Sequence, residues 1–206
     1  MFNKFPLIIP VFPLSGVIYF PKTNLPLNVF EQRYLSLVND VVKKDKLMGM
    51  IQSTKINDKV YNVGCLGKIN GYQKGKDGKI LINLAGLTRF EIIGEIENSK
   101  LYREFKVNYE KFTLDTKPVI EKVNTVLLMK KAKIFFEKNG LLLNWKEFEK
   151  LDEVQKISTL AMIAPITNEE KQKLLESVSL NEKVQTLQDI INFYLHEVDF
   201  DNQTIQ

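Results

Sequence analysis

Short apolar runs separated by turn residues fill the first half of the chain, a pattern that predicts β-strands. The runs Leu7–Leu14 and Leu47–Gln52 have strand length, and the second is expected to lie parallel or next to the first. Pro10 and Pro13 restrict the first run to a sheet edge or a bulge, because proline donates no ladder hydrogen bond. Residues 104–112 alternate in the manner of a half-buried antiparallel strand.

A hairpin lies at the centre of this region. The segment Lys74–Lys79 contains Asp77-Gly78, a pair favoured in tight turns between two strands. Short strands with tight turns and one helix near the start predict a small, closed or nearly closed β-barrel. The strands expected around the hairpin are 63–72, strongly bent because it carries glycines at 64, 67 and 71, then 80–85 and 88–93, joined near Gly86.

The apolar spacing becomes helical in two regions. Residues 31–45 predict one helix beside the strands, and from Val119 onward the pattern is helical throughout. The first helix of the second region is expected to stop at Asn139-Gly140, a C-cap signature. The later helices are expected to begin at Asn144 with Glu147, Thr167 with Glu170 and Ser179 with Glu182, and the last to cover about 180–198.

These patterns divide the chain into two parts of an α+β protein. The composition changes at Thr113–Pro118, where the strands end and the helices begin. We therefore expect a β-rich barrel with one helix at 1–112, a linker at 113–118 and a C-terminal helical bundle at 119–206.

One stretch, Val11–Tyr34, is unusual because it places large apolar side chains around three prolines. It is expected to begin as a strand, pass through an apolar loop and enter the helix at about Glu31. A protein in water must bury such a surface or bind something with it, and both readings of the loop stay open. The candidate binding residues are Phe20, Pro21, Leu25, Pro26, Leu27 and Phe30.

Three charged residues stand among apolar ones, namely Glu31, Arg33 and Arg89. They could form a charged anchor in a ligand groove, or a carboxylate–guanidinium pair that ties the helix start to the strand pair. The structural interpretation is favoured, because Glu31 also suits the first turn of a helix.

Charge and composition narrow the function classes. The chain has 206 residues, 44% of them hydrophobic, which is enough for a packed core. Its net charge of +4 is spread evenly, whereas a nucleic-acid groove would need clustered basic residues. No run approaches the ~20 apolar residues of a membrane span, so we expect a cytoplasmic protein.

The sequence contains few residues that could form a catalytic or metal site. Cys65 is the only cysteine and His196 the only histidine, and they lie in different halves of the chain, so neither a metal cluster nor a Cys–His nucleophile is expected. The segment Gly71–Asp77 lacks the spacing and the Lys-Ser/Thr pair of a phosphate-binding loop. Ser15 lacks the elbow of a hydrolase serine. We expect no catalytic residue, no metal and no cofactor.

Several segments occur in a characteristic order, and the first is the most specific. They are FPLSGVIYFPKTNLPLNVFEQRY (12–34), VGCLGKI (63–69), DGK (77–79), AGLTRFEI (85–92) and IAPITNEEKQKLLE (163–176). With them the sequence resembles the N-terminal, substrate-binding domain of Lon proteases, and more closely the stand-alone bacterial proteins made only of that domain. The resemblance spans roughly residues 6–197.

The resemblance implies a PUA-like β pseudo-barrel with one helix, followed by a helical bundle. It also implies recognition of unfolded or tagged proteins. It covers neither the ATPase module with its Walker motif nor the protease module with its Ser–Lys dyad, so neither activity is expected.

The leading interpretation is a non-enzymatic module that binds unfolded or partly folded polypeptides and serves in protein quality control. Burial of apolar side chains that unfolded segments expose would drive this binding. The alternatives are an adaptor or regulator of a partner protease, RNA binding by a PUA-like barrel, and last an unrecognised enzyme. Contact with nucleic acid is disfavoured, no membrane contact is expected, and the oligomeric state is left open.

Overall fold

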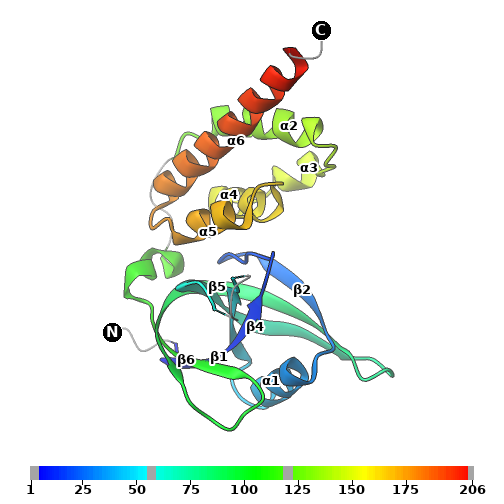
Figure 1. Cartoon of the computed structure of the whole chain (residues 1–206), viewed down its shortest axis with the longest axis vertical. Helices are drawn as coiled ribbons and strands as arrows, with labels where there is room; N and C mark the ends of the chain where they lie inside the picture. The colour runs from blue at the N-terminus through cyan, green and yellow to red at the C-terminus, as the bar shows by residue number, and fades with distance from the viewer. Residues whose placement is uncertain (1–4, 55–58, 118–122, 204–206) are drawn as a thin grey trace. The chain divides into compact units, whose positions relative to one another are not determined.

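The strands of the N-terminal half pair into one six-stranded sheet (Figure 1). The computed structural model describes residues 5–54, 59–117 and 123–203, and from 197 onward the backbone alone. The order β2-β5-β4-β3-β1-β6, with a further β5–β6 pairing, closes β1, β3, β4, β5 and β6 into a ring. The strands are β1 (Ile8–Leu14), β2 (Asn24–Val29), β3 (Leu47–Gln52), β4 (Val63–Lys74), β5 (Ile80–Ile96) and β6 (Arg103–Asn108).

The ring contains both pairing directions, as the sequence indicated. β1 and β3 run parallel, and the other pairs are antiparallel. The turn between β4 and β5 is the predicted hairpin, with Gly78 in the left-handed region at φ 84°. The α+β class is therefore confirmed, and β4 is irregular at Asn70, which the register shift between Ile69 and Gly71 leaves without a pairing partner in β5.

β5 corrects the expectation of two strands at 80–85 and 88–93, because it is one continuous strand of 17 residues. Its first part pairs with β2 and its last part with β6, so one strand serves two neighbours on the same edge. The strand does not break near Gly86. Leu66 of β4 faces Thr88 and Gly67 faces Gly86, so Leu87 is an extra residue that β5 accommodates as a bulge. Gly86 instead allows the backbone at Phe20 to approach β5 closely, since a Cβ there would lie 2.2 Å from the carbonyl oxygen of Phe20.

β2 is a second correction, because it occupies much of the stretch expected to be a loop. It lies at the end of the strand order, and an edge strand can contain a proline such as Pro26. Its alternation places Leu27 and Val29 in the core. Leu25 packs against the same core from a partly buried position.

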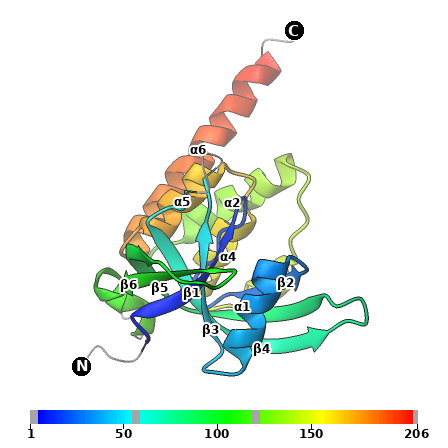
Figure 2. The same ribbon diagram turned by 60° about the horizontal axis from the view of Figure 1, so that its bottom comes forward.

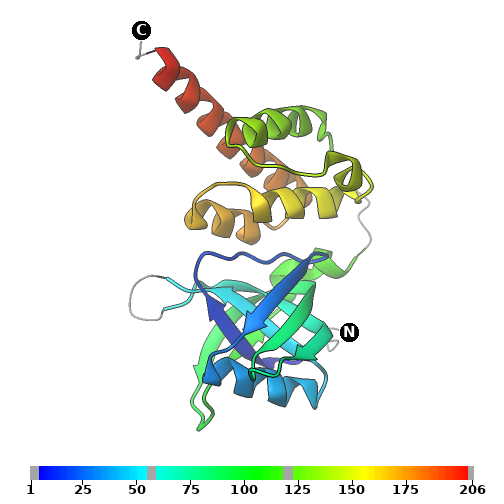
Figure 3. The same cartoon turned by 90° about the vertical axis from the view of Figure 1, so that its right-hand side faces the viewer.

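The one helix of this unit, α1 (Gln32–Val42), is shorter than the predicted 31–45. Its buried residues Tyr34, Leu37 and Val38 pack into the core cluster of the ring. The helix ends where the polar run begins, and Lys46 takes a left-handed conformation at φ 63° that leads into β3. Figure 2 and Figure 3 show α1 beside the strands of the ring.

The expected linker at 113–118 is largely structured. Residues Glu110–Thr116 form a 3₁₀ helix, η1, that packs on β5, and the first compact unit extends to Lys117. The cause is Asp115, which pairs with a buried arginine of β5. The strand predicted at 104–112 accordingly ends at Asn108.

The second compact unit, Pro118–Gln206, is helical over its described residues, and α6 contacts α2, α4 and α5. α2 begins at Val126 rather than at Val119, and residues 118–122 lie outside the described residues. Over the described parts of the chain, no helix is both long and apolar enough to cross a membrane. The helices are α2 (Val126–Lys138), α3 (Trp145–Phe148), α4 (Glu153–Ile163), α5 (Asn168–Glu176) and α6 (Leu180–Gln203).

The predicted starts of the later helices and the end of α2 are confirmed, whereas α6 continues to Gln203 beyond the expected end at about 198. The backbone N–H groups of Glu147 and Glu170 donate to the side chains of Asn144 and Thr167, and that of Glu182 donates to Ser179. Gly140 follows α2 with φ 66°. The start of α4 was not predicted, although Asp152 and Gln155 form a reciprocal capping box there.

Gly86→Ala should destabilise the protein by about 1–3 kcal/mol, because its methyl group would collide with backbone that cannot rotate away. The matched control is Gly94→Ala in the same strand, where a Cβ meets no atom within 4 Å. Urea unfolding followed by circular dichroism measures both. Equal midpoints for the two variants would show that the Gly86 approach is not a constraint.

Candidate functional site

The structure separates the predicted apolar binding residues into two groups. Phe20 is 0% and Leu27 9% exposed, and Pro21 is buried as well. Leu27 belongs to the core cluster of the ring. These three residues are therefore unavailable as a binding surface in this structure, which corrects that part of the expectation.

The turn around Phe20 is held to β5 by backbone hydrogen bonds. The N–H of Lys22 donates to the carbonyl of Gly86 over 3.0 Å, and the N–H of Gly86 donates to the carbonyl of Thr23 over 2.9 Å. The hydroxyl of Thr23 donates to the Phe20 carbonyl over 2.7 Å. Lys22 takes the left-handed conformation at φ 62° that lets the chain reverse here. This part of the stretch is a fixed structural turn.

The other predicted residues lie toward solvent. Pro26 is exposed, and Phe30, which follows the end of β2, is 61% exposed. Leu81 of β5, 49% exposed, lies opposite Asn28, which shares its strand face with Pro26. We call Pro26, Phe30 and Leu81 the outer β2 surface. Leu81 was missed by sequence reasoning, because only the pairing of β2 with β5 brings it beside the other two.

Asparagine side chains border this surface. The amide of Asn83 donates to the side-chain oxygens of Asn24 over 3.3 Å and Asn70 over 2.6 Å. The three residues come from β5, β2 and β4, so the amides link three neighbouring strands. Uncharged amides beside apolar groups can make hydrogen bonds and apolar contacts but cannot perform acid–base chemistry.

The predicted polar anchors do not form a trio. Glu31 and Arg33 make an exposed ion pair, with Oε2 and Nη2 3.0 Å apart, at the start of α1. The Arg33 guanidinium lies 4.6 Å from the ring centre of Tyr34, whose hydroxyl donates to the Pro13 carbonyl. This pair is local to the helix start.

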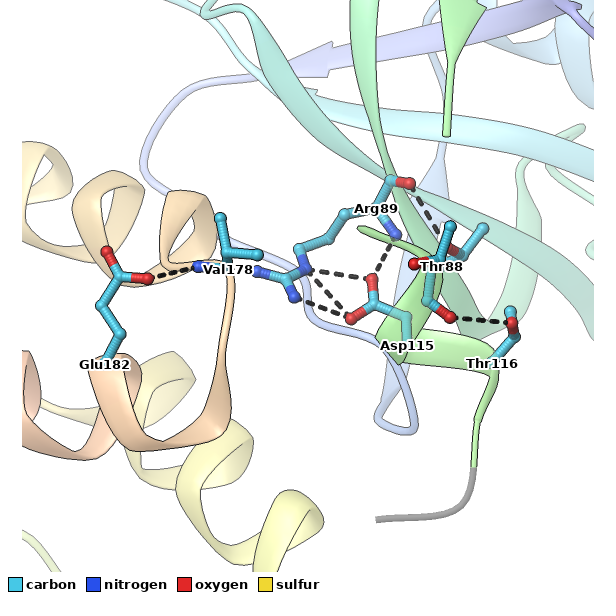
Figure 4. A network of polar contacts seen from close by, with 7 residues as sticks. Thr88, Arg89, Asp115, Thr116, Val178 and Glu182 are labelled. Carbon is cyan, nitrogen blue, oxygen red and sulfur yellow. Dashed lines mark hydrogen bonds and ion pairs between the residues drawn. The ribbon is translucent and has the colours of Figure 1, made fainter. Parts of the chain in front are cut away.

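Arg89 pairs with Asp115, a partner that the sequence analysis placed in a linker (Figure 4). Nη2 of Arg89 lies 2.7 Å from Oδ1 of Asp115, and its Nε and backbone N–H also donate to that carboxylate. The guanidinium lies 4.3 Å from the ring centre of Phe112. Arg89 is 2% exposed, so this is a buried, bidentate tie between β5 and η1.

The remaining candidate residues are Cys65 and His196. Cys65 is buried in the ring, and burial raises the pKa of the nearby Tyr19 hydroxyl far above its usual range. His196 is exposed. Among the described residues, no group of three or more His, Cys, Asp or Glu side chains could hold a metal ion.

Comparison with known proteins gives a consistent result. A family model described as the ATP-dependent protease La (LON) substrate-binding domain matches residues 8–192. The chain is 27% identical to the Lon protease of Syntrophus aciditrophicus over 93% of its length and 25% identical to that of Bacillus thuringiensis over 89%. It covers 26% and 24% of those two proteins, so it spans about a quarter of their length.

Two solved structures share the fold. A Lon N-terminal domain protein from Xanthomonas campestris has a TM-score of 0.66 at 20% identity, covering 87% of this chain and 96% of its own. The N-terminal domain of a Mycobacterium avium complex Lon protease has a TM-score of 0.64 at 16% identity, covering 90% and 98%.

Asp115→Ala should cost about 3–5 kcal/mol of unfolding free energy, because it leaves the buried guanidinium of Arg89 without its carboxylate. Glu31→Ala, which removes the exposed pair, should cost less than about 1 kcal/mol. Urea unfolding of the two variants separates the cases. A loss of similar size in both would contradict the assignment of Arg89–Asp115 as the structural tie.

Proposed function

Because the chain belongs to the family of ATP-dependent protease La (LON) substrate-binding domains, we propose that it is a non-enzymatic module that binds segments of unfolded polypeptide. The family match over 8–192 is the observation that carries the proposal. A role in protein quality control in the cytoplasm, a PUA-like type for the ring and a bundle for the helical unit are parts of the same proposal.

The outer β2 surface is the proposed contact region. Unfolded segments expose apolar side chains, and their burial against Phe30, Pro26 and Leu81 would release water from both partners. Pro26 and Leu81 lie in the paired strands β2 and β5, so little of their backbone freedom is lost on binding. The bordering asparagine amides are suited to hydrogen bonds with an extended backbone.

Contact through side chains is favoured over addition of a strand to the sheet. Among the described strands β2 is paired on one side only, but Pro26 offers no N–H donor in the middle of that strand. An incoming strand would find an interrupted ladder. A segment that lies across the outer face avoids this restriction.

A second candidate is a regulator of a partner protease of the Lon type. The relatives favour this function. Nearly the whole chain is similar to one part of Lon proteases, so it could make the contacts that this part makes in them. Co-purification distinguishes the two functions. One stoichiometric protease partner supports the regulator, and a heterogeneous set of unfolded clients supports the binding module.

Phe30→Ala and Leu81→Ala should each weaken binding of a fluorescently labelled, reduced and alkylated lysozyme, which stays unfolded. Loss of a central apolar anchor costs about 1–3 kcal/mol, or roughly 5- to 150-fold in Kd. Fluorescence anisotropy measures the affinity.

The control is Leu101→Ala, an apolar residue 66% exposed in the turn between β5 and β6. It should bind as well as the unmodified protein does. If all three variants bind with unchanged affinity, the outer β2 surface is not the contact region.

A further inference from the structure

A small pocket opens beside the C-terminal end of α1, on the outer side of β1 and β6. Its volume is about 100 Å³, the size of one side chain. Ile8 and Pro10 of β1 and Leu47 of β3 contribute apolar walls, with the Tyr102 ring beside them. Asp40, Asp45 and Glu104 line the same pocket. The pocket thus combines apolar walls with carboxylates.

Two of these carboxylates lack a cationic partner among the residues that the structure describes. Asp40 accepts a hydrogen bond from the Tyr102 hydroxyl over 2.9 Å, and Asp45 accepts one from the backbone N–H of Leu47 over 3.1 Å. Both bonds come from neutral donors, so among the described residues neither carboxylate has an ion-pair partner within 4 Å. Glu104 differs, because its carboxylate lies 2.7 Å from the ammonium of Lys100.

The surroundings strengthen the effect of these charges. Tyr102 is 5% exposed, and its pKa is raised, first by burial and then by its hydrogen bond to Asp40. Solvent screens a carboxylate charge less beside such a buried ring than on an open surface, so its attraction for a cation is stronger. Lys44, the one cation among the lining residues described, does not pair with Asp40 or Asp45. A cation entering the pocket would therefore meet unneutralised carboxylates.

We propose that this pocket receives an arginine side chain of a bound polypeptide. The aliphatic stem would lie along Ile8, Pro10 and Leu47, and the guanidinium would meet the carboxylates of Asp40 and Asp45. Arginine fits better than lysine, because its planar fork can serve two carboxylates at once. The inference rests on the proposed polypeptide-binding function and adds a preference to it.

The neighbouring surface fits the same occupant. Leu7 is 52% and Ile8 51% exposed, so apolar residues flanking the arginine would also find a contact. The preferred segment is then apolar with an embedded basic residue. The outer β2 surface, formed by Pro26, Phe30 and Leu81, has no charged group of its own and cannot supply this selection.

The test uses two fluorescent twelve-residue peptides that differ at one central position. One carries arginine among apolar residues, and the other carries citrulline, which has the same shape without the charge. The arginine peptide should bind the full chain at least tenfold more tightly, and the difference should shrink as salt is added. In the Asp40→Asn/Asp45→Asn double variant the two peptides should bind equally. Asparagine keeps an acceptor for Tyr102 and for the Leu47 N–H, so the fold is expected to persist.

Amide resonances of Ile8 and Val41 should shift on addition of the arginine peptide, which places the contact at the pocket. Glu31→Gln, an exposed acidic residue outside it, should keep the full difference between peptides. Equal affinity of the two peptides for the unmodified protein would overturn the pocket assignment, as would a difference retained by the double variant. If unfolded lysozyme still binds in either case, only the pocket fails. If neither lysozyme nor the peptides bind, the proposed function fails with it.

Discussion

Strand β5 pairs with three other strands and also contacts η1, and the structure of the N-terminal unit depends on these contacts. It pairs with β2 and β6 along one edge and with β4 along the other, and it carries η1 through the buried Arg89–Asp115 pair. Gly86 is the point of tightest approach, where the backbone of the Phe20 turn fits only because no side chain intervenes. Three residues apart on one strand, these two contacts hold the turn and the end of the unit in place.

This arrangement explains which parts of the apolar N-terminal stretch can contact other molecules. Phe20 lies in a turn held to β5 by backbone hydrogen bonds, and Leu27 faces the core of the ring. Pro26 of β2 and Phe30, which directly follows that strand, are exposed. An apolar surface bordered by amides can make apolar contacts and hydrogen bonds with a bound segment. The acidic pocket beside α1 adds charge selection at a separate place in the same unit.

Much of the fold follows from local signals in the sequence. The hairpin at Asp77-Gly78 and the three capping pairs were predicted because each depends on residues a few positions apart. The failures are long-range. Nothing local shows that 80–96 is one strand, because it continues past Gly86 only through a bulge at Leu87 in its pairing with β4. Arg89 and Asp115 are 26 residues apart in the sequence. From the sequence alone, Asp115 therefore looked like any acidic residue of a linker. β2 was predicted as a loop because it contains Pro26, although its apolar and polar residues alternate as in a strand.

The central claim is that the outer β2 surface contacts unfolded polypeptide. A photo-crosslinking amino acid placed at position 30 tests it most directly, with the same group at position 101 as the comparison. After irradiation with unfolded, alkylated lysozyme, the account predicts crosslinks from position 30 and few from position 101. Crosslinks of equal yield from both positions, or none from position 30 under conditions where lysozyme binds, would contradict it.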